Sequence, residues 1–281
     1  MKMLKPKNDI VFQSLFNKSN ENITKNFVES LLEEKVYKIR INEEKELYRE
    51  NPEEKLGILD LELDVNDNEK VDVEIQLINK NNFVDRLLYY FSKLYASTVN
   101  IGKEYKEAKR VVIIAILDYE FEKTKEIEEM ETKWRIVCTK HPELELTKKL
   151  EINIIELSKM RRNYYRNKED KKSQWLMFID DPNSKEVKEI MEKNKEIKEA
   201  IIEVHKMSEE EKIQRLADLR EKARMDETAI RDYGIEEGIE QGRKEGEKNK
   251  SIEIAKKLLK MNMPIKDIME VTGLTKEEIE K

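Results

Sequence analysis

Residues 57–78, GILDLELDVNDNEKVDVEIQLI, decide the fold of this chain. Apolar and polar residues alternate strictly on both sides of the tetrapeptide at residues 66–69, which is the pattern of two β-strands joined by a tight turn. Strand side chains alternate between the two faces of a sheet, so the acidic residues of each strand share one face. The stretch therefore predicts a β-hairpin with one apolar face and one acidic face.

The length of the hairpin loop decides whether the two acidic rows lie on the same side of the sheet. In an antiparallel pair they coincide only when the loop has an odd number of residues. A three-residue loop starting at Asn66 would place Asp60 opposite Glu74. Directly opposed residues have Cβ atoms about 4.5–5.5 Å apart, so these carboxylates would repel each other unless a cation lay between them. Mg²⁺ is the natural candidate, because it prefers hard oxygen ligands.

A plainer interpretation of the acidic face also stands. Alternation of this kind is most often found where one face of an antiparallel sheet is exposed to water. The run RVVIIAIL at residues 110–117 favours a covered sheet instead, because a nearly continuous apolar run is typical of a strand buried on both faces. A row of acidic side chains on a covered face would therefore call for a functional explanation.

The residues around the hairpin predict a mixed α/β order. Apolar residues recur at helical spacing between residues 10 and 32, and an aromatic-rich helix is expected over residues 82–105. Further strands are expected at residues 37–48, 134–139 and 150–157, and further helices around Trp175 and Phe178 and over residues 184–200. The fold class that follows is α/β, with a mixed central sheet flanked by helices over residues 1–205 and an α-helical C-terminal extension.

Residues 206–250 form a highly charged, helix-favouring linker. They carry Gly234, Gly238, Gly242 and Gly246 at a four-residue period. On a helix these glycines would form a slowly drifting stripe, open to close approach by another backbone. Because a glycine inside a helix costs about 1 kcal/mol, a frayed and flexible tract is the other interpretation.

Residues 251–281 form a separate expected unit of short helices. Pro264 lies near the first turn of one helix and Gly273 follows its end, and Thr275 with Glu278 makes a capping box for the last helix. Three short helices of this kind suit either a helix-turn-helix DNA reader or a docking and homo-oligomerisation tail. The many acidic residues favour the tail.

The composition excludes several classes of protein. Charged residues make up 41% of the chain, but the formal net charge of −6 argues against a general nucleic-acid coat while leaving room for a local basic groove. One cysteine cannot form an internal disulfide, and with two histidines it falls short of a structural zinc set. No apolar stretch approaches the roughly 20 residues of a membrane span, so we expect a soluble, cytoplasmic protein.

Several of these residues together resemble a known family. They are Asp60, the Glu74-Ile75-Gln76 triplet on the next strand, and Arg86, Tyr89, Tyr90 and Tyr95 on the following helix. The arrangement is similar to that of the Rpn family, the recombination-promoting nucleases and transposases of the PD-(D/E)XK superfamily. The opening KNDIVFQSLF, the passage GKEYKEAKRVVIIAIL and the C-terminal MPIKDIMEVTGLTKEEI resemble the same family, so the similarity covers nearly the whole chain.

The resemblance implies a restriction-endonuclease-like core and a metal-dependent DNA endonuclease, associated with mobile-element recombination or defence in bacteria. By the same resemblance Asp60 and Glu74 would bind Mg²⁺, with Mn²⁺ or another divalent cation as alternatives, and Asp9 would assist them. Arg86 would contact a phosphate of the DNA, since a guanidinium can clamp phosphate bidentately, and Tyr90 would hydrogen-bond or stack nearby.

Gln76 occupies the place of the superfamily lysine. By the resemblance it would position the attacking water, but glutamine carries no charge and cannot act as a base. Lys70 and Lys80 are nearby lysines that could supply the charge, although lysines in such places are commonly solvated. Glutamine here is typical of this family, so the departure bears on the rate more than on the type of reaction.

Two other classes of function remain open. A nuclease-derived protein that no longer cleaves would serve as a DNA-binding or protein-interaction module through its glycine-striped helix and tail, and Gln76 and the acidic net charge favour it. A structural assembly protein built on the tail would form an oligomer that is lost when the chain is cut before Ser208. The presence of both Asp60 and Glu74 favours the enzyme.

Overall fold

The computed structural model describes residues 3–42, 61–79, 82–99 and 104–279. The chain divides into two compact units, Met1–Lys222 and Ala223–Lys281. The first contains the sheets and the helices packed on them, and the second contains most of a long helix and two short ones. Asp60 and Lys80 lie outside the described residues.

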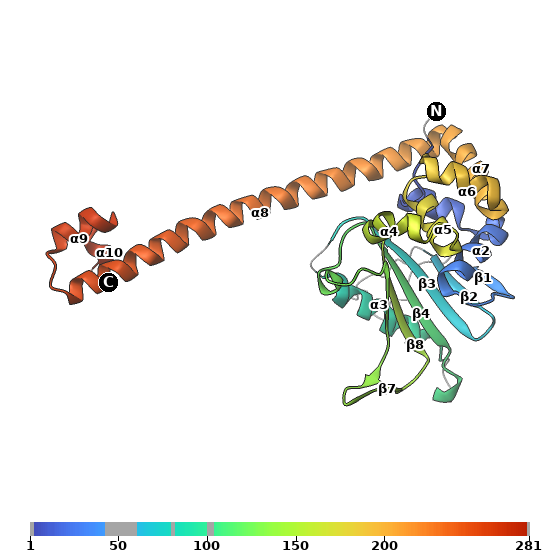
Figure 1. The fold of residues 1–281 in the computed structure, drawn as a ribbon, viewed down its shortest axis with the longest axis horizontal. Coiled ribbons are helices and arrows are strands. Elements are labelled where there is room, and N and C mark those ends of the chain that lie inside the picture. Colours follow the sequence, from blue (N-terminus) through green and yellow to red (C-terminus); the bar gives the residue numbers. More distant parts are fainter. Residues whose placement is uncertain (1–2, 43–60, 80–81, 100–103, 280–281) are drawn as a thin grey trace. The chain divides into compact units, whose positions relative to one another are not determined.

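The first unit is built on a mixed six-stranded sheet (Figure 1). In spatial order its strands are β1 (Ile39–Asn42), β2 (Leu61–Val65), β3 (Glu69–Gln76), β4 (Arg110–Leu117), β8 (Leu150–Glu156) and β5 (Glu131–Trp134). β3, β4 and β8 run parallel to one another, whereas β1, β2 and β5 are antiparallel to their neighbours. The predicted mixed sheet is confirmed. A separate ribbon pairs β6 (Val137–Cys138) with β7 (His141–Glu145).

β2 and β3 form the predicted hairpin. Because Val65 pairs with Glu69, the loop between them has three residues, as the coinciding acidic rows require. Asn66 and Asp67, the first two loop residues, have φ angles of 49° and 62°. These angles lie in the left-handed region, which Asn and Asp tolerate better than most other residues. The residue types of the loop therefore suit its backbone.

Helices cover the face of the sheet opposite to the acidic row. They are α1 (Asp9–Leu15), α2 (Glu21–Leu32), α4 (Leu157–Asn163), α5 (Lys171–Asp180), α6 (Lys185–Lys193) and α7 (Lys195–Glu209). Their apolar residues share one core with the apolar rows of β2 and β3 and with alternate residues of β4. Near its centre Phe16 stacks on Phe27 with ring centroids 4.4 Å apart, and Trp175 lies 5.5 Å from Phe27. The helices predicted before residue 32 and around Trp175 are confirmed.

The other face of the sheet is covered by α3 (Phe83–Ser97). Its buried residues form a second core with the remaining alternate residues of β4. The members from the two elements are Phe83, Leu87, Phe91, Leu94, Val111, Ile113, Ala115 and Leu117. β4 is therefore buried on both faces, as its apolar run predicts.

α3 ends at Ser97, earlier than the predicted residue 105. The hydroxyl groups of Ser97 and Thr98 donate to the carbonyl oxygens of Leu94 and Tyr95, each at 2.7 Å. Such side-chain bonds to the backbone compete with continuation of a helix. Short 3-10 helices occur elsewhere as η1 (Lys18–Asn20), η2 (Tyr105–Glu107), η3 (Glu122–Thr124) and η4 (Tyr164–Arg166).

The N-terminal segment is held by residues far along the chain. The Leu4 backbone N–H donates to Ser208 Oγ at 2.9 Å. Lys7 Nζ lies 2.7 Å from Asp118 Oδ2 and 2.8 Å from Asp180 Oδ1. The start of the chain is therefore an integral part of the first unit.

The long helix α8 (Glu211–Lys260) runs through the glycine-rich tract. Gly234, Gly238, Gly242 and Gly246 are all helical, so the frayed-tract interpretation is wrong. A Cβ atom added at any of them would meet nothing within 4 Å in the part of the chain that the structure describes. The stripe therefore exists and is open.

The second unit closes with α9 (Ile265–Thr272) and α10 (Lys276–Ile279). α9 ends at Gly273, whose φ of 70° is left-handed, as the predicted stop requires. The Thr275 backbone N–H donates to Glu278 Oε2 at 3.0 Å, and the Glu278 N–H donates to Thr275 Oγ1 at 3.3 Å. The predicted capping box is confirmed. The small core of this unit consists of Ala255, Ile268, Leu274 and Ile279.

Candidate active site

The acidic face of the hairpin is buried. Glu62 and Asp64 on β2 are each 9% exposed, and Asp72 and Glu74 on β3 are 0% and 3% exposed. Glu62 lies opposite Asp72 in the sheet, so both rows share the face on which α3 packs. The interpretation of this row as a solvated face is wrong, because a helix covers that face.

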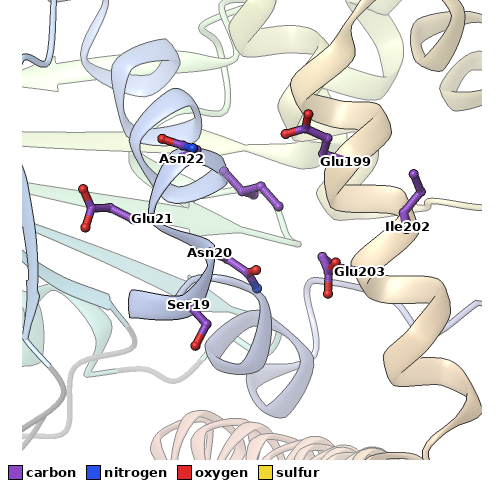
Figure 2. Close-up of a pocket in the computed structure, with 8 residues that line it drawn as sticks. Ser19, Asn20, Glu21, Asn22, Glu199, Ile202 and Glu203 are labelled. Atoms are coloured by element: carbon purple, nitrogen blue, oxygen red, sulfur yellow. The ribbon is translucent and has the colours of Figure 1, made fainter.

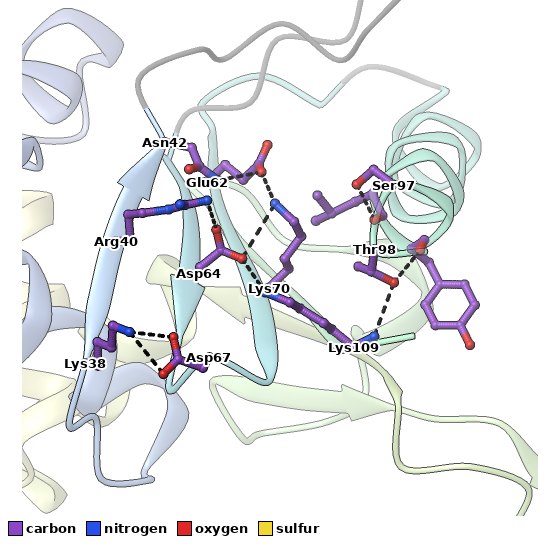
Figure 3. A network of polar contacts seen from close by, with 12 residues as sticks. Lys38, Arg40, Asn42, Glu62, Asp64, Asp67, Lys70, Ser97, Thr98 and Lys109 are labelled. Atoms are coloured by element: carbon purple, nitrogen blue, oxygen red, sulfur yellow. Dashed lines mark hydrogen bonds and ion pairs between the residues drawn. The ribbon is translucent and has the colours of Figure 1, made fainter. Parts of the chain in front are cut away.

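Glu62 is neutralised by the protein itself (Figure 3). Lys70 Nζ and Asn42 Nδ2 both donate to its Oε1 atom. Lys70 precedes Glu74 by four residues, which is about 13 Å along a strand. Because its ammonium group is also engaged by Glu62, Lys70 does not take the place of the superfamily lysine beside Glu74.

Asp64 is neutralised in the same network (Figure 3). Lys109 Nζ and Arg40 Nη2 donate to its two carboxylate oxygens, each at 2.9 Å. Burial raises the pKa of Asp64, but the hydrogen bond from Lys109 and the charges of Lys70, Lys109 and Arg40 outweigh burial, so the pKa is lowered. Asp64 is therefore held as an anion by cations of this chain.

Glu74 belongs to a different set of contacts at the far end of β3. Gln76 Nε2 lies 3.4 Å from Glu74 Oε2, and Arg86 Nη2 on α3 donates to Gln76 Oε1. A side-chain amide has one accepting oxygen and one donating NH₂ group, so the bond from Arg86 turns the NH₂ group of Gln76 toward Glu74. We call this row of three side chains the relay. It brings together three of the residues predicted for the site.

The loop after β4 also borders the relay, and sequence reasoning missed it. The Asp118 backbone N–H donates to the Gln76 carbonyl oxygen at 3.0 Å. Burial raises the pKa of Tyr119 to about 12, and the charge of Arg86 opposes this effect. Asp118 is the first polar residue after the buried run, at the carboxyl end of a strand parallel to β3. That position is the signal by which it could have been found.

Asp9 and Tyr90 lie in other surroundings. Asp9 is in the first turn of α1, where its Oδ2 atom is 3.3 Å from Arg220 Nε and its side chain is 40% exposed. Tyr90 packs against the core under α3, with its ring 5.8 Å from that of Tyr89. The roles of Asp9 and Tyr90 at the site stay predictions.

A hollow of about 490 Å³ lies elsewhere, between the start of α2 and α7 (Figure 2). Three of its lining residues are Glu21, Glu199 and Glu203. Three carboxylates would repel a phosphate group, and none of the relay residues lines this hollow. It is therefore a poor place for phosphodiester chemistry, and the hairpin face remains the candidate site.

A mixed sheet with helices on both faces and a buried acidic hairpin within it agrees with the restriction-endonuclease-like fold that the PD-(D/E)XK family implies. The family described as PD-(D/E)XK nuclease family transposase matches residues 6–234, and the chain belongs to this family. The resemblance inferred from the sequence is thereby confirmed. No curated protein and no solved structure matches the chain.

Family membership supports a nuclease- or transposase-like function and suggests DNA as the substrate. Nucleases of this superfamily generally use divalent metal ions. Within the described ranges, no helix is long and apolar enough to cross a membrane.

Within the relay, Glu74 is the residue that fits a hard divalent cation. Glu74 offers carboxylate oxygens, which Mg²⁺ prefers, whereas the amide oxygen of Gln76 is already bonded to Arg86. The described residues contain no group of three or more His, Cys, Asp or Glu side chains placed to hold a metal. Mg²⁺ is commonly held by only one or two carboxylates, with substrate phosphate and water as its other ligands. Glu74 and one further carboxylate would thus be a sufficient protein contribution.

Proposed function

We propose that this protein is a metal-dependent endonuclease that hydrolyses phosphodiester bonds of DNA, with a role in bacterial mobile-element recombination or defence. The observation that carries the proposal is the relay from the buried Glu74 through Gln76 to Arg86 at the carboxyl end of β3. In this row the carboxylate can bind a cation, the amide can hydrogen-bond a water molecule, and the guanidinium can bind a phosphate. Family membership supports the same reaction.

Asp60 and Glu74 are the residues that would hold the metal, which is Mg²⁺ or in its place Mn²⁺ or another divalent cation. When bound, such an ion activates water and neutralises the charge that grows on the phosphate. The three-residue loop of the hairpin supports this choice of ligands, because the prediction that Asp60 and Glu74 form a pair depends on a loop of that length.

Gln76 and Arg86 act as a pair. With its oxygen held by Arg86, Gln76 donates from its NH₂ group to the attacking water or to a phosphate oxygen. Arg86 supplies the positive charge that lysine supplies elsewhere in the superfamily, and a guanidinium keeps that charge at any physiological pH. Asp9 assists the metal ligands, and Tyr90 hydrogen-bonds to or stacks on the DNA.

Cleavage of supercoiled plasmid tests the proposal. Wild type, Asp60→Asn and Glu74→Gln are compared in Mg²⁺, in Mn²⁺ and in chelator, after thermal unfolding has shown that each variant folds. Asp67→Asn is the matched control, since it removes a carboxylate from the same hairpin at a side chain that is 70% exposed. We expect metal-dependent nicking by wild type and control, reduced by about 10²-fold or more in the other two.

A second function is favoured by Gln76, which lacks the lysine charge, and by the net charge of −6. It is a nuclease-derived protein that no longer cleaves and binds DNA or protein through its helical C-terminal region. This function becomes the better one if folded wild type shows no more nicking than Glu74→Gln with any metal.

The predicted domain organisation of the chain belongs to the same proposal. It comprises a nuclease-like domain over residues 1–205, a charged linker over 206–250 and a helical unit over 251–281 that forms homo-oligomers. Light scattering on the full chain and on a chain ending at Lys222, the last residue of the first unit, tests the oligomer. A monomeric mass for both chains would contradict the proposed homo-oligomerisation through residues 251–281.

A further inference from the structure

A basic segment lies at the end of the sheet where the relay lies. β3, β4 and β8 are parallel, so their carboxyl ends meet at one edge of the sheet. Gln76 is the last residue of β3, and Glu156, the last residue of β8, leads directly into α4. The basic segment consists of residues 161–168, RRNYYRNK, and comprises the end of α4 and the residues that follow it.

Hydrogen bonds connect the basic segment, through the loop after β4, to the backbone at the end of β3. Arg161 Nη1 donates to Asp118 Oδ1 at 3.0 Å, and Arg162 donates to Glu120. Asp118 in turn donates its backbone N–H to the carbonyl oxygen of Gln76 at 3.0 Å. The loop after β4 is therefore bonded both to the backbone of Gln76 and to the basic segment, which places that segment at the edge of the sheet where β3 and the relay end.

The basic segment is also the kind of surface that binds a polyanion. It contains four cations and no acidic residue, in a chain whose net charge is −6. The side chain of Arg162 is 56% exposed, and Tyr165 is 74% exposed. Arg166 and Lys168 are exposed as well, and neither forms an ion pair with another described residue. Exposed cations that the protein does not neutralise, with an aromatic ring among them, suit a nucleic-acid strand.

Arg161 has a different role from the other cations. It is shared between Asp118 and Asp180, which also bind Lys7, so its charge holds elements of the protein together. The ion pair between Arg162 and Glu120, in contrast, is exposed, and exposed pairs contribute little. A phosphate group can replace Glu120 there at small cost.

We infer that Arg162, Tyr165, Arg166 and Lys168 bind the sugar–phosphate backbone of the DNA beside the scissile bond. The inference rests on the proposed function for the identity of the substrate. Arg and Lys contacts to phosphate position the duplex without reading its sequence. The exposed ring of Tyr165 offers a stacking surface for a base where a strand is unpaired. Binding at this segment would bring a phosphate group to the relay.

Binding of fluorescein-labelled duplex DNA by the full chain, in chelator, tests the inference by fluorescence anisotropy over a series of salt concentrations. The double variant Arg162→Gln with Arg166→Gln removes two exposed charges. Lys195→Gln with Lys198→Gln on α7 is the control, because it removes two exposed charges elsewhere in the first unit. Both variants should unfold at the wild-type temperature, since the side chains lie on the surface.

The two variants should differ in affinity and in salt dependence. Each lost phosphate contact lowers the slope of log K against log salt by about 0.9, so the arginine variant should lose about 2 in slope and bind about tenfold or more weakly. The control should retain the wild-type slope. Equal behaviour of the two variants, or no DNA binding by wild type, overturns the inference.

Plasmid nicking in Mg²⁺ separates this inference from the proposed function. If the arginine variant alone loses binding but wild type does not nick, the nuclease function fails and the DNA contact stands. If nicking depends on Glu74 while the arginine variant binds and nicks as the control does, the function stands and the basic segment is not the contact.

Discussion

Replacement of Arg86 by alanine tests the relay most directly. Arg86 donates to Gln76 Oε1, and Gln76 Nε2 lies 3.4 Å from Glu74 Oε2. Without Arg86 the amide loses the bond that sets its orientation, and this end of the site loses its positive charge. Removal of one preorganised donor lowers a rate by about 10²–10³, which is about 2.7–4 kcal/mol of transition-state stabilisation.

Arg86→Ala combined with Gln76→Lys is the diagnostic variant. Lysine at position 76 restores a cation next to Glu74, so we expect the double variant to nick DNA about tenfold faster or more than Arg86→Ala. Gln76→Lys alone places two cations side by side, and their repulsion should keep its rate below that of wild type. The interaction free energy of the cycle should then exceed about 1.4 kcal/mol in favour of the double variant.

The assay is single-turnover nicking of supercoiled plasmid with protein in excess and Mg²⁺ present. Lys93→Ala is the matched control, because it removes a cation two turns further along α3, and it should leave the rate unchanged. A wild-type rate for Arg86→Ala would show that the relay plays no part in cleavage. A double variant no faster than Arg86→Ala would refute the idea that Arg86 replaces the superfamily lysine.

The remaining predictions concern stability and are measured on the full chain. The pKa of Asp180 is lowered, because hydrogen bonds and charges from its cationic neighbours outweigh the opposing effect of burial. Asp180 therefore stabilises the fold above its unfolded pKa of about 3.9, and this stability is lost as the pH falls through the folded pKa. In urea unfolding at several pH values, Asp180→Asn should therefore be less stable than wild type at pH 7 and lose less stability below about pH 4; parallel pH curves would contradict this. Lys159 Nζ is buried and lies 2.6 Å from Glu156 Oε1. Glu156→Gln removes the negative charge of this pair and should lower the free energy of unfolding by about 3–5 kcal/mol. An unchanged urea midpoint would show that the pair contributes nothing. Gly273→Ala should increase amide hydrogen exchange in α9, because a side chain at this left-handed C-cap costs about 1–2 kcal/mol. Gly246→Ala should instead slow exchange in α8, because it stabilises that helix by about 0.5–1 kcal/mol. Changes of equal sign in the two helices would refute the argument.

The hairpin and the buried strand were predictable because their information is local. Period-2 alternation reports which residues share a strand face, and only a loop with an odd number of residues aligns the two acidic rows. The apolar run of β4 similarly reports burial on both faces. The pattern does not report what covers a face, and the burial of Glu74 depends on α3, which packs through residues of its own and of β4.

The electrostatics of the site could be predicted only in part. Arg86 was placed near the metal ligands by the family resemblance, but its bond to Gln76 could not be read from spacing along one helix. The ion pair of Lys109 with Asp64 joins residues 45 positions apart, and no periodicity relates such residues. The basic segment at residues 161–168 was not singled out from the sequence, because its place at the end of β3 follows from the parallel order of β3, β4 and β8 and from the bond between Arg161 and Asp118.

The hydrogen bond from Leu4 to Ser208 sets an order of events during synthesis. The two residues are 204 positions apart. Because a ribosome adds about 5–20 residues per second, Ser208 is synthesised about 10–40 s after Leu4. Lys7 likewise waits for Asp180, which helps to hold the loop beside Gln76. A nascent chain therefore lacks the support of its candidate site until nearly the whole first unit has left the ribosome.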